Sequence, residues 1–460
     1  MNTTRLYARA ALLPTGWTPD VVIDIDRDGT IVASTPGRRE DADQIAPGPV
    51  ICGMPNVHSH AFQRALVGHT GPAAPHGADS FWTWRTAMYR FLDRIDPDAF
   101  EAIAAQAYVE MAKSGYTTVG EFHYVHRDPR GATYGDLAEL ALRTVAAAGL
   151  AGVRLTLLPV FYAHGGFGAA PPAPGQRRFL HDLQSFGALF DVLSARSTDD
   201  AFVLGVAPHS LRAVTPEELR EVVAMTRNGP IHIHAAEQTR EVDECVAWSG
   251  RRPVEWLLRN AGVNARWCIV HATHMTGEET DELASSGATV GLASTTEADL
   301  GDGIFPADRY VRCGGSWGIG TDSNTIVDPF VELRQLEWSQ RLHLHRRNVL
   351  APAGAISLGV ALWNAAAQGG SRALAQPAGA IAPGHRADLV VLNTDDPALA
   401  EQPPERILDA AIFGPCRAPV RDVMSGGRWI VRDGRHMREE EIFDAFRRTL
   451  ARLDAMPPET

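Results

Sequence analysis

The feature that most constrains the fold is an alternation, from about residue 51 to residue 377, of short apolar segments with amphipathic helical ones. Helices are predicted at residues 98–115, 134–149, 215–229, 251–263 and 276–287. The apolar, β-rich segments are residues 117–122, 152–160, 202–209, 230–237, 267–273, 288–294 and 316–322. This alternation is typical of parallel βα units, which form either a closed barrel or a doubly wound sheet. No dinucleotide or phosphate-binding glycine loop follows these segments, so we predict an α/β protein with a (β/α)8 TIM-like barrel.

The two ends of the chain have a different pattern. Residues 1–50 contain short alternating runs broken by Gly, Pro and Asp-Gly turns, and residues 378–436 return to this texture. We expect the two ends to pair into one small β-sandwich domain beside a barrel at residues 51–377. Helical spacing predicts a C-terminal helix within residues 437–460.

Composition excludes several classes of function. The net charge of -12 argues against a nucleic-acid partner, because no basic stripe is present to contact phosphates. No apolar run approaches the length of a membrane span, and we read no export signal at the N-terminus. The five cysteines are scattered without a Cys-x-x-Cys pair, which suits reduced thiols. We therefore expect a cytoplasmic protein that binds neither nucleic acid nor membrane.

Polar side chains end six of the predicted strands. They are His58 and His60, His123 and Tyr124, His209 and Arg212, His234 and Glu237, His271 and His274, and Asp322. A single histidine in such a position is more often a hydrogen-bonded structural residue. Six polar strand ends in one barrel instead favour a site at the carboxyl end of the strands, where barrel enzymes place their chemistry.

A metal ion is the simplest ligand for this set. Alternation along an extended strand places His58 and His60 on the same face, so both can bind one ion. His234 and Asp322 would complete a nitrogen and oxygen set that suits zinc, which lowers the pKa of a bound water towards ~7. Asp322 could instead cap the turn TDSN. Ferrous iron would accept the same ligands, so the metal identity stays open.

Several motifs resemble a known family. HSH at 58–60, HIHAAE at 232–237, VHATH at 270–274 and GTDS at 320–323 resemble the signature of the amidohydrolase superfamily, in its mononuclear deaminase branch. PGHRADLVVL at 383–392 fits its composite β-domain. Longer blocks resemble the N-formimino-L-glutamate deiminases of bacterial histidine degradation: AFQRA, DSFWTWR, EFHYVH, HSLRAVTP, AEQTREVDECVAWSGRRP and STTEADLGDGIFP. The resemblance spans essentially the whole chain.

The resemblance implies a role for each matching residue. The zinc ligands would be His58, His60, His234 and Asp322. The catalytic acid and base groups would be Glu237, His271 and Asp322. The substrate-binding residues would be Gln63, Arg85, Tyr124, His209 and Arg212. Binuclear relatives use a carbamylated lysine, but Lys113 is the only lysine and lies in a helix upstream of its strand, so a single metal is expected.

The implied activity is hydrolysis of N-formimino-L-glutamate to N-formyl-L-glutamate and ammonia, a reaction at a C–N bond other than a peptide bond. Arginines suit such a small dicarboxylate substrate, because planar guanidinium groups bind carboxylates in a bidentate manner. Two alternatives stay open, a purine or pyrimidine deaminase and a non-catalytic metal-binding scaffold. Arg85 could also be a surface ion-pair partner, and Gln63 could cap a helix. The resemblance further implies a homodimer.

Two positions depart from the family pattern. Asp299 stands where asparagine is expected, and Asn324 stands where histidine is expected. Neither is a predicted metal ligand, but Asn324 leaves the pocket wall undefined.

Overall fold

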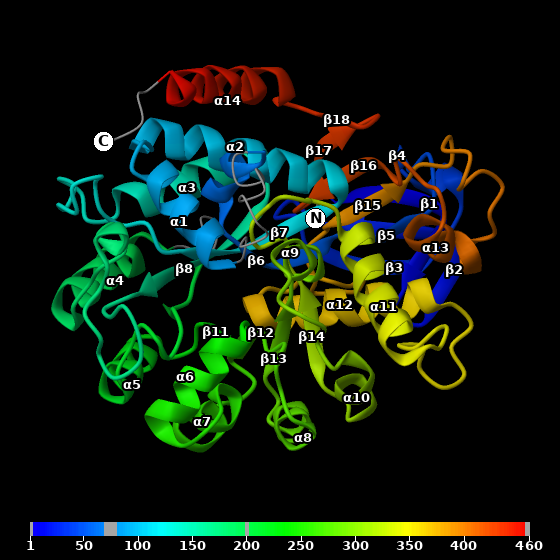
Figure 1. Ribbon diagram of the computed structural model, residues 1–460. Helices are drawn as coiled ribbons and strands as arrows, with labels where there is room; N and C mark the ends of the chain where they lie inside the picture. The colour runs from blue at the N-terminus through cyan, green and yellow to red at the C-terminus, as the bar shows by residue number, and fades with distance from the viewer. Residues whose placement is uncertain (1–2, 69–80, 198–201, 456–460) are drawn as a thin grey trace.

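The computed structural model describes residues 3–68, 81–197 and 202–455 and contains the predicted barrel (Figure 1). Its parallel strands are β6 (Met54–Ser59), β7 (Tyr116–His123), β8 (Arg154–Phe161), β9 (Val203–Leu204), β10 (Ala207–Pro208), β11 (Ile231–Ala235), β12 (Trp267–His271), β13 (Thr289–Leu292) and β14 (Ser316–Ile319). The short strands β9 and β10 together occupy the fourth position of the barrel.

The barrel consists of two hydrogen-bonded arcs. One arc has the order β6, β7, β8, β10, and the other has the order β11, β12, β13, β14. Parallel bridges Val206 to Ile231 and Ser210 to His234 join the arcs on one side, and the bridge Ser59 to Asp322 joins them on the other. The barrel therefore closes next to the predicted metal ligands.

Helices follow the strands, and several of them begin at side-chain caps. They are α1 (Phe81–Leu92), α2 (Pro97–Ser114), α3 (Glu139–Ala151), α4 (Leu183–Arg196), α5 (Pro216–Met225), α6 (Thr239–Ser249), α7 (Pro253–Asn260), α8 (Gly277–Ser285), α9 (Ser294–Leu300), α10 (Ala307–Arg312), α11 (Pro329–Leu344) and α12 (Leu358–Leu374). The side chain of Asp96 accepts from Ala99 N at the start of α2, and Thr215 and Thr276 begin α5 and α8 in capping boxes. Short 3-10 turns occur at Arg39–Asp41 (η1), Ala61–Leu66 (η2) and Pro174–Gln176 (η3).

Helix α12 closes the amino-terminal end of the barrel. Near its end, Leu374 O accepts from Thr156 Oγ1 at 2.9 Å, and Ala373 O lies 2.8 Å from His232 Nε2. Gly369 allows this approach, because a Cβ atom there would lie 1.8 Å from the carbonyl oxygen of Trp317. The opposite, carboxyl-terminal end is left for a site.

Strands from both chain ends form one mixed, nine-stranded sheet beside the barrel (Figure 1). They are β1 (Thr4–Leu13), β2 (Gly16–Ile25), β3 (Ile31–Pro36), β4 (Gln44–Ile45), β5 (Val50–Cys52), β15 (Leu389–Leu392), β16 (Val420–Ser425), β17 (Arg428–Arg432) and β18 (Arg435–His436). The two ends meet where β5 pairs with β1 on one side and β15 on the other. This sheet agrees with the predicted composite β-domain, whereas the residues chosen as domain bounds stay a prediction.

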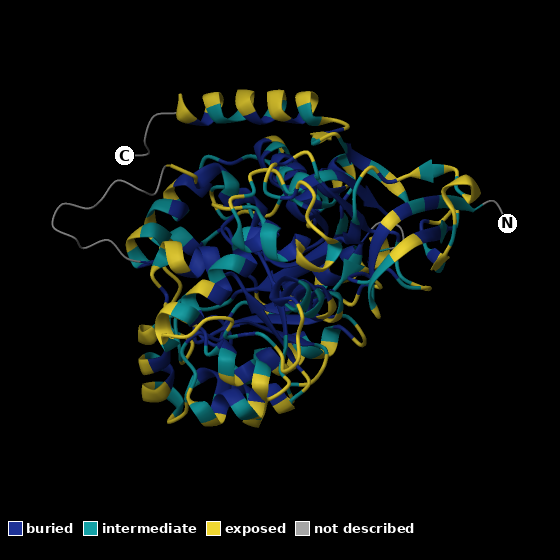
Figure 2. Cartoon of the chain, turned by 90° about the vertical axis from the view of Figure 1, so that its right-hand side faces the viewer, coloured by how far each residue is buried: buried dark blue, intermediate teal, exposed yellow. Residues whose placement is uncertain are grey.

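Two helices follow β15, α13 (Pro404–Phe413) and α14 (Glu439–Asp454). Helix α14 packs on α2 through Ile442, Phe446 and Leu453, and its outer face is exposed (Figure 2). Burial is concentrated inside the barrel and between it and its helices. Within the described ranges, none of the helices has the length and apolar character that a membrane crossing requires.

Candidate active site

Three imidazoles and one carboxylate meet at the carboxyl end of the barrel. The Nε2 atoms of His58 and His60 are 3.2 Å apart, and those of His58 and His234 are 3.1 Å apart. Asp322 Oδ1 lies 3.5 Å from His58 Nε2 and 3.3 Å from His60 Nε2. The structure thus brings together all four predicted ligands, and the three histidines form a buried group that could hold a metal ion.

This geometry fits one tetrahedral ion. Four ligand atoms held about 2.0–2.1 Å from a common centre lie about 3.3 Å from one another, close to the four distances above. His60 Nδ1 lies 3.0 Å from the carbonyl oxygen of Phe122, and His234 Nδ1 lies 3.1 Å from that of His209. Because a carbonyl only accepts, each Nδ1 carries the hydrogen and each Nε2 presents a lone pair to the cluster. Two imidazole lone pairs directed toward His58 Nε2, beside the Asp322 carboxylate, form a donor set that suits a cation.

Left-handed backbone conformations gather around the cluster. Five non-glycine residues at or near the ends of β11, β12 and β14 have φ between +46° and +67°: Ala236, His271, Ala272, Asp322 and Asn324. Each such residue costs on the order of 1–3 kcal/mol and persists only where its surroundings hold it. This concentration of strain is typical of a functional site.

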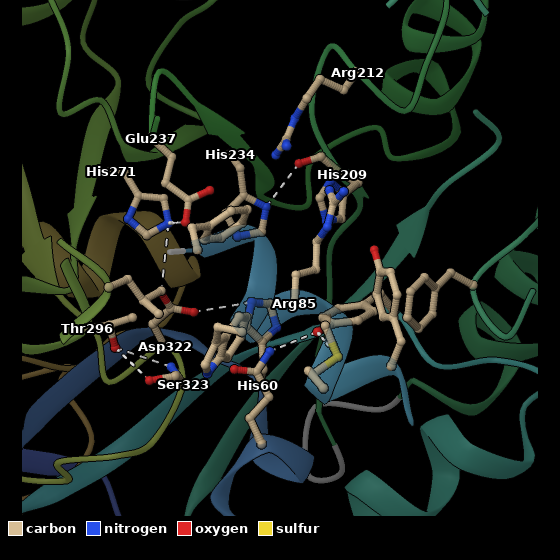
Figure 3. Close-up of a pocket in the computed structure, with 18 of the residues that line it drawn as sticks. His60, Arg85, His209, Arg212, His234, Glu237, His271, Thr296, Asp322 and Ser323 are labelled. Atoms are coloured by element: carbon tan, nitrogen blue, oxygen red, sulfur yellow. Dashed lines mark hydrogen bonds and ion pairs between the residues drawn. The ribbon is translucent and has the colours of Figure 1, made fainter. Parts of the chain in front are cut away.

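Glu237 and His271 face the metal cluster from one side of the pocket (Figure 3). His271 Nε2 lies 3.8 Å from Glu237 Oε1 and 3.8 Å from Asp322 Oδ2. Burial raises the pKa of Glu237 to about 7. Burial alone would lower the pKa of His271, but the surrounding carboxylates, Glu237 foremost, raise it to about 10. A carboxyl group that titrates near neutral pH is suited to donate and accept protons.

All five predicted substrate-binding residues line one pocket above the cluster. They are Gln63, Arg85, Tyr124, His209 and Arg212. Gln63 Nε2 donates to the Tyr124 hydroxyl at 2.8 Å, so this amide contacts the pocket and does not cap the following turn. Arg85, His209 and Arg212 lie on one side of the pocket, and Glu237 and His271 lie on the other (Figure 3). A substrate bound between them would reach both sets of groups.

Two guanidinium groups in this pocket have no carboxylate partner. Neither Arg85 nor Arg212 forms an ion pair with any residue that the structure describes, and the buried Nε of Arg212 has no hydrogen-bond partner. The Cζ atoms of Arg85 and Arg212 instead lie 4.4 Å and 6.0 Å from the ring centroid of Trp82. Burial alone would lower the pKa of Arg212, but Glu241 and Glu237 raise it without forming a direct ion pair with this residue, so its guanidinium stays charged. Both arginines therefore have donors available for an anion in the pocket.

Sequence reasoning alone misses part of the pocket wall. The additional lining residues are Phe81, Trp84, Met88, Tyr89, Tyr162, Phe179, Thr296, Leu300 and Ser323. Tyr162 comes directly after β8, and Thr296 follows β13 closely, so position at a strand end is a signal that could have found both. Phe179 lies in a long connection, where no local pattern marks it.

Two of the polar strand ends are structural. The His123 ring packs edge-on against Phe100 and His126, and its Nδ1 lies 3.4 Å from Thr144 Oγ1. His274 Nε2 lies 2.8 Å from the carbonyl oxygen of Asp302 and donates to it. Neither histidine lines the pocket.

Asn324 supports the metal cluster from behind instead of forming the pocket wall. It is fully buried, and its Nδ2 donates to the carbonyl oxygens of His60 at 3.0 Å and Asp322 at 3.1 Å. Asparagine tolerates the left-handed conformation observed here. The departure from histidine is therefore compatible with the loop that carries Asp322.

Two further sequence expectations concern Asp299 and Lys113, which lie away from the pocket. Asp299 is exposed on α9. Lys113 lies on α2 and pairs with Glu439 of α14, so it is not directed at the cluster. A lysine-bridged second metal has no support here.

Comparison with known proteins places this site in a family. The amidohydrolase family profile matches residues 47–430, and a profile described as the N-terminal domain of formimidoylglutamate deiminase HutF matches residues 3–45. A formimidoylglutamate deiminase from Pseudomonas aeruginosa is 48% identical over 97% of this chain and 99% of its own length. The chain belongs to the amidohydrolase family, in its formimidoylglutamate deiminase branch.

Solved amidohydrolase structures agree with the fold. An amidohydrolase from Brucella melitensis is 46% identical, with a TM-score of 0.92 over 98% of this chain and all of its own. An adenosine deaminase from Xanthomonas campestris, solved with bound zinc, has a TM-score of 0.81 at 22% identity over 98% of this chain and 99% of its own. The present chain also matches an 8-oxoguanine deaminase from Pseudomonas aeruginosa, with 27% identity over 84% of this chain and 82% of that protein. Ring deaminases are thus more distant relatives.

Proposed function

We propose that this enzyme hydrolyses N-formimino-L-glutamate to N-formyl-L-glutamate and ammonia, a step of histidine degradation. The observation that carries the proposal is the pair of unpaired guanidinium groups, Arg85 and Arg212, across the pocket from Glu237 and His271. A dicarboxylate with an electrophilic formimino carbon matches both sides of the pocket: its carboxylates suit the two arginines, and its formimino group suits Glu237 and His271. The 48% identity to a formimidoylglutamate deiminase supports the same substrate.

A single zinc ion is the cofactor that this donor set favours, with ferrous iron as the alternative. His58, His60, His234 and Asp322 would hold it. When bound, the ion supplies a Lewis acid that activates water for attack.

The remaining chemistry is proton transfer by side chains. Attack of water on the formimino carbon forms a C–O bond and leaves a tetrahedral carbon bearing two nitrogens. Asp322 is placed to take the first proton of the water, with His271 stabilising it, and protonated Glu237 to donate to the imino nitrogen. The hydroxyl proton of the tetrahedral carbon then passes to Glu237, which gives it to the departing ammonia, and the proton held by Asp322 restores the protonated Glu237. Breaking the C–N bond to ammonia gives the formyl product, so atoms and protons balance.

Residues on the side of the pocket opposite Glu237 and His271 would orient the substrate. Arg212 and Arg85 would bind the two carboxylates, and His209 would contribute a further hydrogen bond. Gln63 and Tyr124, already joined to each other, would contact the substrate next to the metal. These five groups distinguish a flexible dianion from a flat ring, which needs stacking and edge recognition.

A homodimer in the cytoplasm, with a barrel at residues 51–377, completes the proposal. We propose the homodimer because the chain resembles a family whose barrels are commonly dimeric. The pairing of β5 with β15 is consistent with the domain division. Light scattering of the purified protein tests the oligomeric state.

The deciding experiment is ammonia release by zinc-loaded enzyme. We expect turnover of N-formimino-L-glutamate, loss of turnover after chelation and recovery on adding zinc. Formimino compounds that lack the side-chain carboxylate should react far more slowly. Release from adenosine or 8-oxoguanine instead would favour a ring deaminase, and no release from any of them would favour a non-catalytic protein.

A further inference from the structure

A buried glutamate outside the pocket contacts the imidazole of His271. Glu297 lies on α9, is 4% exposed and does not line the pocket. Its Oε1 lies 3.3 Å from His271 Nδ1 and accepts from Ala293 N at 3.1 Å. A carboxylate only accepts, so this contact places the ring hydrogen on Nδ1.

The contact determines where the other ring nitrogen points. With Nδ1 held by Glu297, Nε2 is directed between Glu237 and Asp322, at 3.8 Å from each. His271 also has a left-handed backbone, with φ of 67°. A side chain on strained backbone keeps its orientation only if its surroundings hold it, and Glu297 supplies a charged hydrogen-bond partner for this purpose.

We propose that Glu297 is the positioning residue that fixes the orientation of the His271 ring for the deimination reaction. The inference rests on the proposed function, because it assigns Glu297 to the same reaction centre. Glu297 acts through His271 and touches neither the substrate pocket nor the metal ligands' donor atoms. Its loss should therefore affect turnover more than substrate binding.

A neighbouring glutamate offers a matched control. Glu332 of α11 is fully buried and accepts from both the backbone nitrogen and the hydroxyl of Thr295, two residues before Glu297. It thus holds the same helix but contacts no residue of the reaction centre. Replacing Glu332 with glutamine tests the effect of altering a buried acidic side chain in this region alone.

The experiment compares zinc-loaded Glu297→Ala, Glu297→Gln and Glu332→Gln with wild type in the ammonia-release assay. We expect Glu297→Ala to lower kcat by about 10²-fold, the lower range for a positioned acid or base group, with KM within about twofold of wild type. Glu297→Gln keeps an accepting oxygen, so it should recover about tenfold of that loss. Glu332→Gln should keep the wild-type kcat. Zinc content and the urea unfolding midpoint report folding.

Several outcomes would overturn this role. A wild-type kcat in either Glu297 variant would do so, as would a kcat loss that Glu332→Gln reproduces or a KM that rises in step with the fall in kcat. If Glu297→Ala does not fold, Glu297→Gln decides alone, with about a tenfold loss of kcat expected. Absence of ammonia release by the wild type would instead contradict the proposed function, so the two failures are distinct.

Discussion

Glu237 and Arg212 are both buried ionisable side chains in one pocket, yet their loss should have opposite kinetic signatures. Glu237 faces His271 and the cluster, where bonds are made and broken. Arg212 lies across the pocket with no carboxylate partner among the described residues. One group acts on the transition state, and the other binds the substrate.

Glu237→Gln should keep the shape of the side chain but remove its capacity to transfer a proton. We expect kcat to fall by about 10²–10⁴-fold, with zinc content and fold unchanged. Steady-state ammonia release and metal analysis measure both. Turnover near that of the wild type would exclude Glu237 as the acid and base group.

Arg212→Ala should raise KM by about ten- to a hundredfold, the equivalent of the 1.5–3 kcal/mol of a charged hydrogen bond, with a smaller effect on kcat. Arg240→Ala is the matched control. Its Cζ also lies 4.4 Å from the Trp82 ring centroid, but it pairs with Glu244 and does not line the pocket. An unchanged KM in the Arg212 variant, or an equal rise in the Arg240 variant, would contradict the assignment.

Helix α1 is the element that carries Arg85 to the pocket, and a buried arginine from a distant loop holds its end. Arg178 is fully buried and donates to the carbonyl oxygens of Leu92 and Ile95 and to that of Arg127. Arg178 lies 86 residues after the end of α1, so no local pattern could have indicated this contact. The pocket wall therefore depends on a long-range polar contact.

Arg178→Met should destabilise the protein by about 3 kcal/mol, because it leaves buried carbonyl groups without donors. The urea unfolding midpoint at constant zinc loading measures the change. Arg177→Met is the control: Arg177 also donates to carbonyl oxygens, those of Pro129 and Pro174, and pairs with Asp93, but its side chain is partly exposed, so its loss should cost less. Equal effects of the two substitutions would contradict the role of Arg178.

The strands were more predictable than their connections. Alternation of side chains along β6 and β11 places His58 with His60 and sets His234 near a strand end, so these ligands follow from local sequence. The fourth strand is broken into β9 and β10, which the continuous apolar run 202–209 did not indicate. Phe179 and Glu297 reach the site from a long connection and a short helix, where sequence periodicity carries no information about direction.

At the scale of the whole molecule, a row of buried histidines should couple stability to pH. The ring centroids of His123 and His126 are 5.1 Å apart, and those of His126 and His181 are 4.8 Å apart. Burial lowers the pKa of all three, that of His181 to about 3. The unfolded chain binds protons below about pH 6.5 while the folded chain does not, so stability falls as the pH falls below that value.

His126→Gln should make this loss shallower. Glutamine can still donate to Val160 O, which His126 Nε2 contacts at 3.0 Å, but it does not titrate. Between pH 6.5 and pH 5 the variant should lose about 2 kcal/mol less stability than the wild type. Urea unfolding at both pH values and equal zinc loading provides the comparison. Identical pH dependence would show that His126 is protonated in the folded protein.

Sequence patterns predicted the barrel and the pairing of the chain ends, and strand-end positions together with the family motifs indicated the four residues at the metal cluster. Strand alternation and the position of a residue at a strand's carboxyl end are local properties, so a short stretch of sequence is enough to predict them. Only the tertiary structure decided that Arg85 and Arg212 lack partners, that His123 and His274 face away from the pocket, and that Glu297 contacts His271. Those outcomes depend on which elements meet when the barrel closes, and contacts between distant segments leave no periodic trace in the sequence.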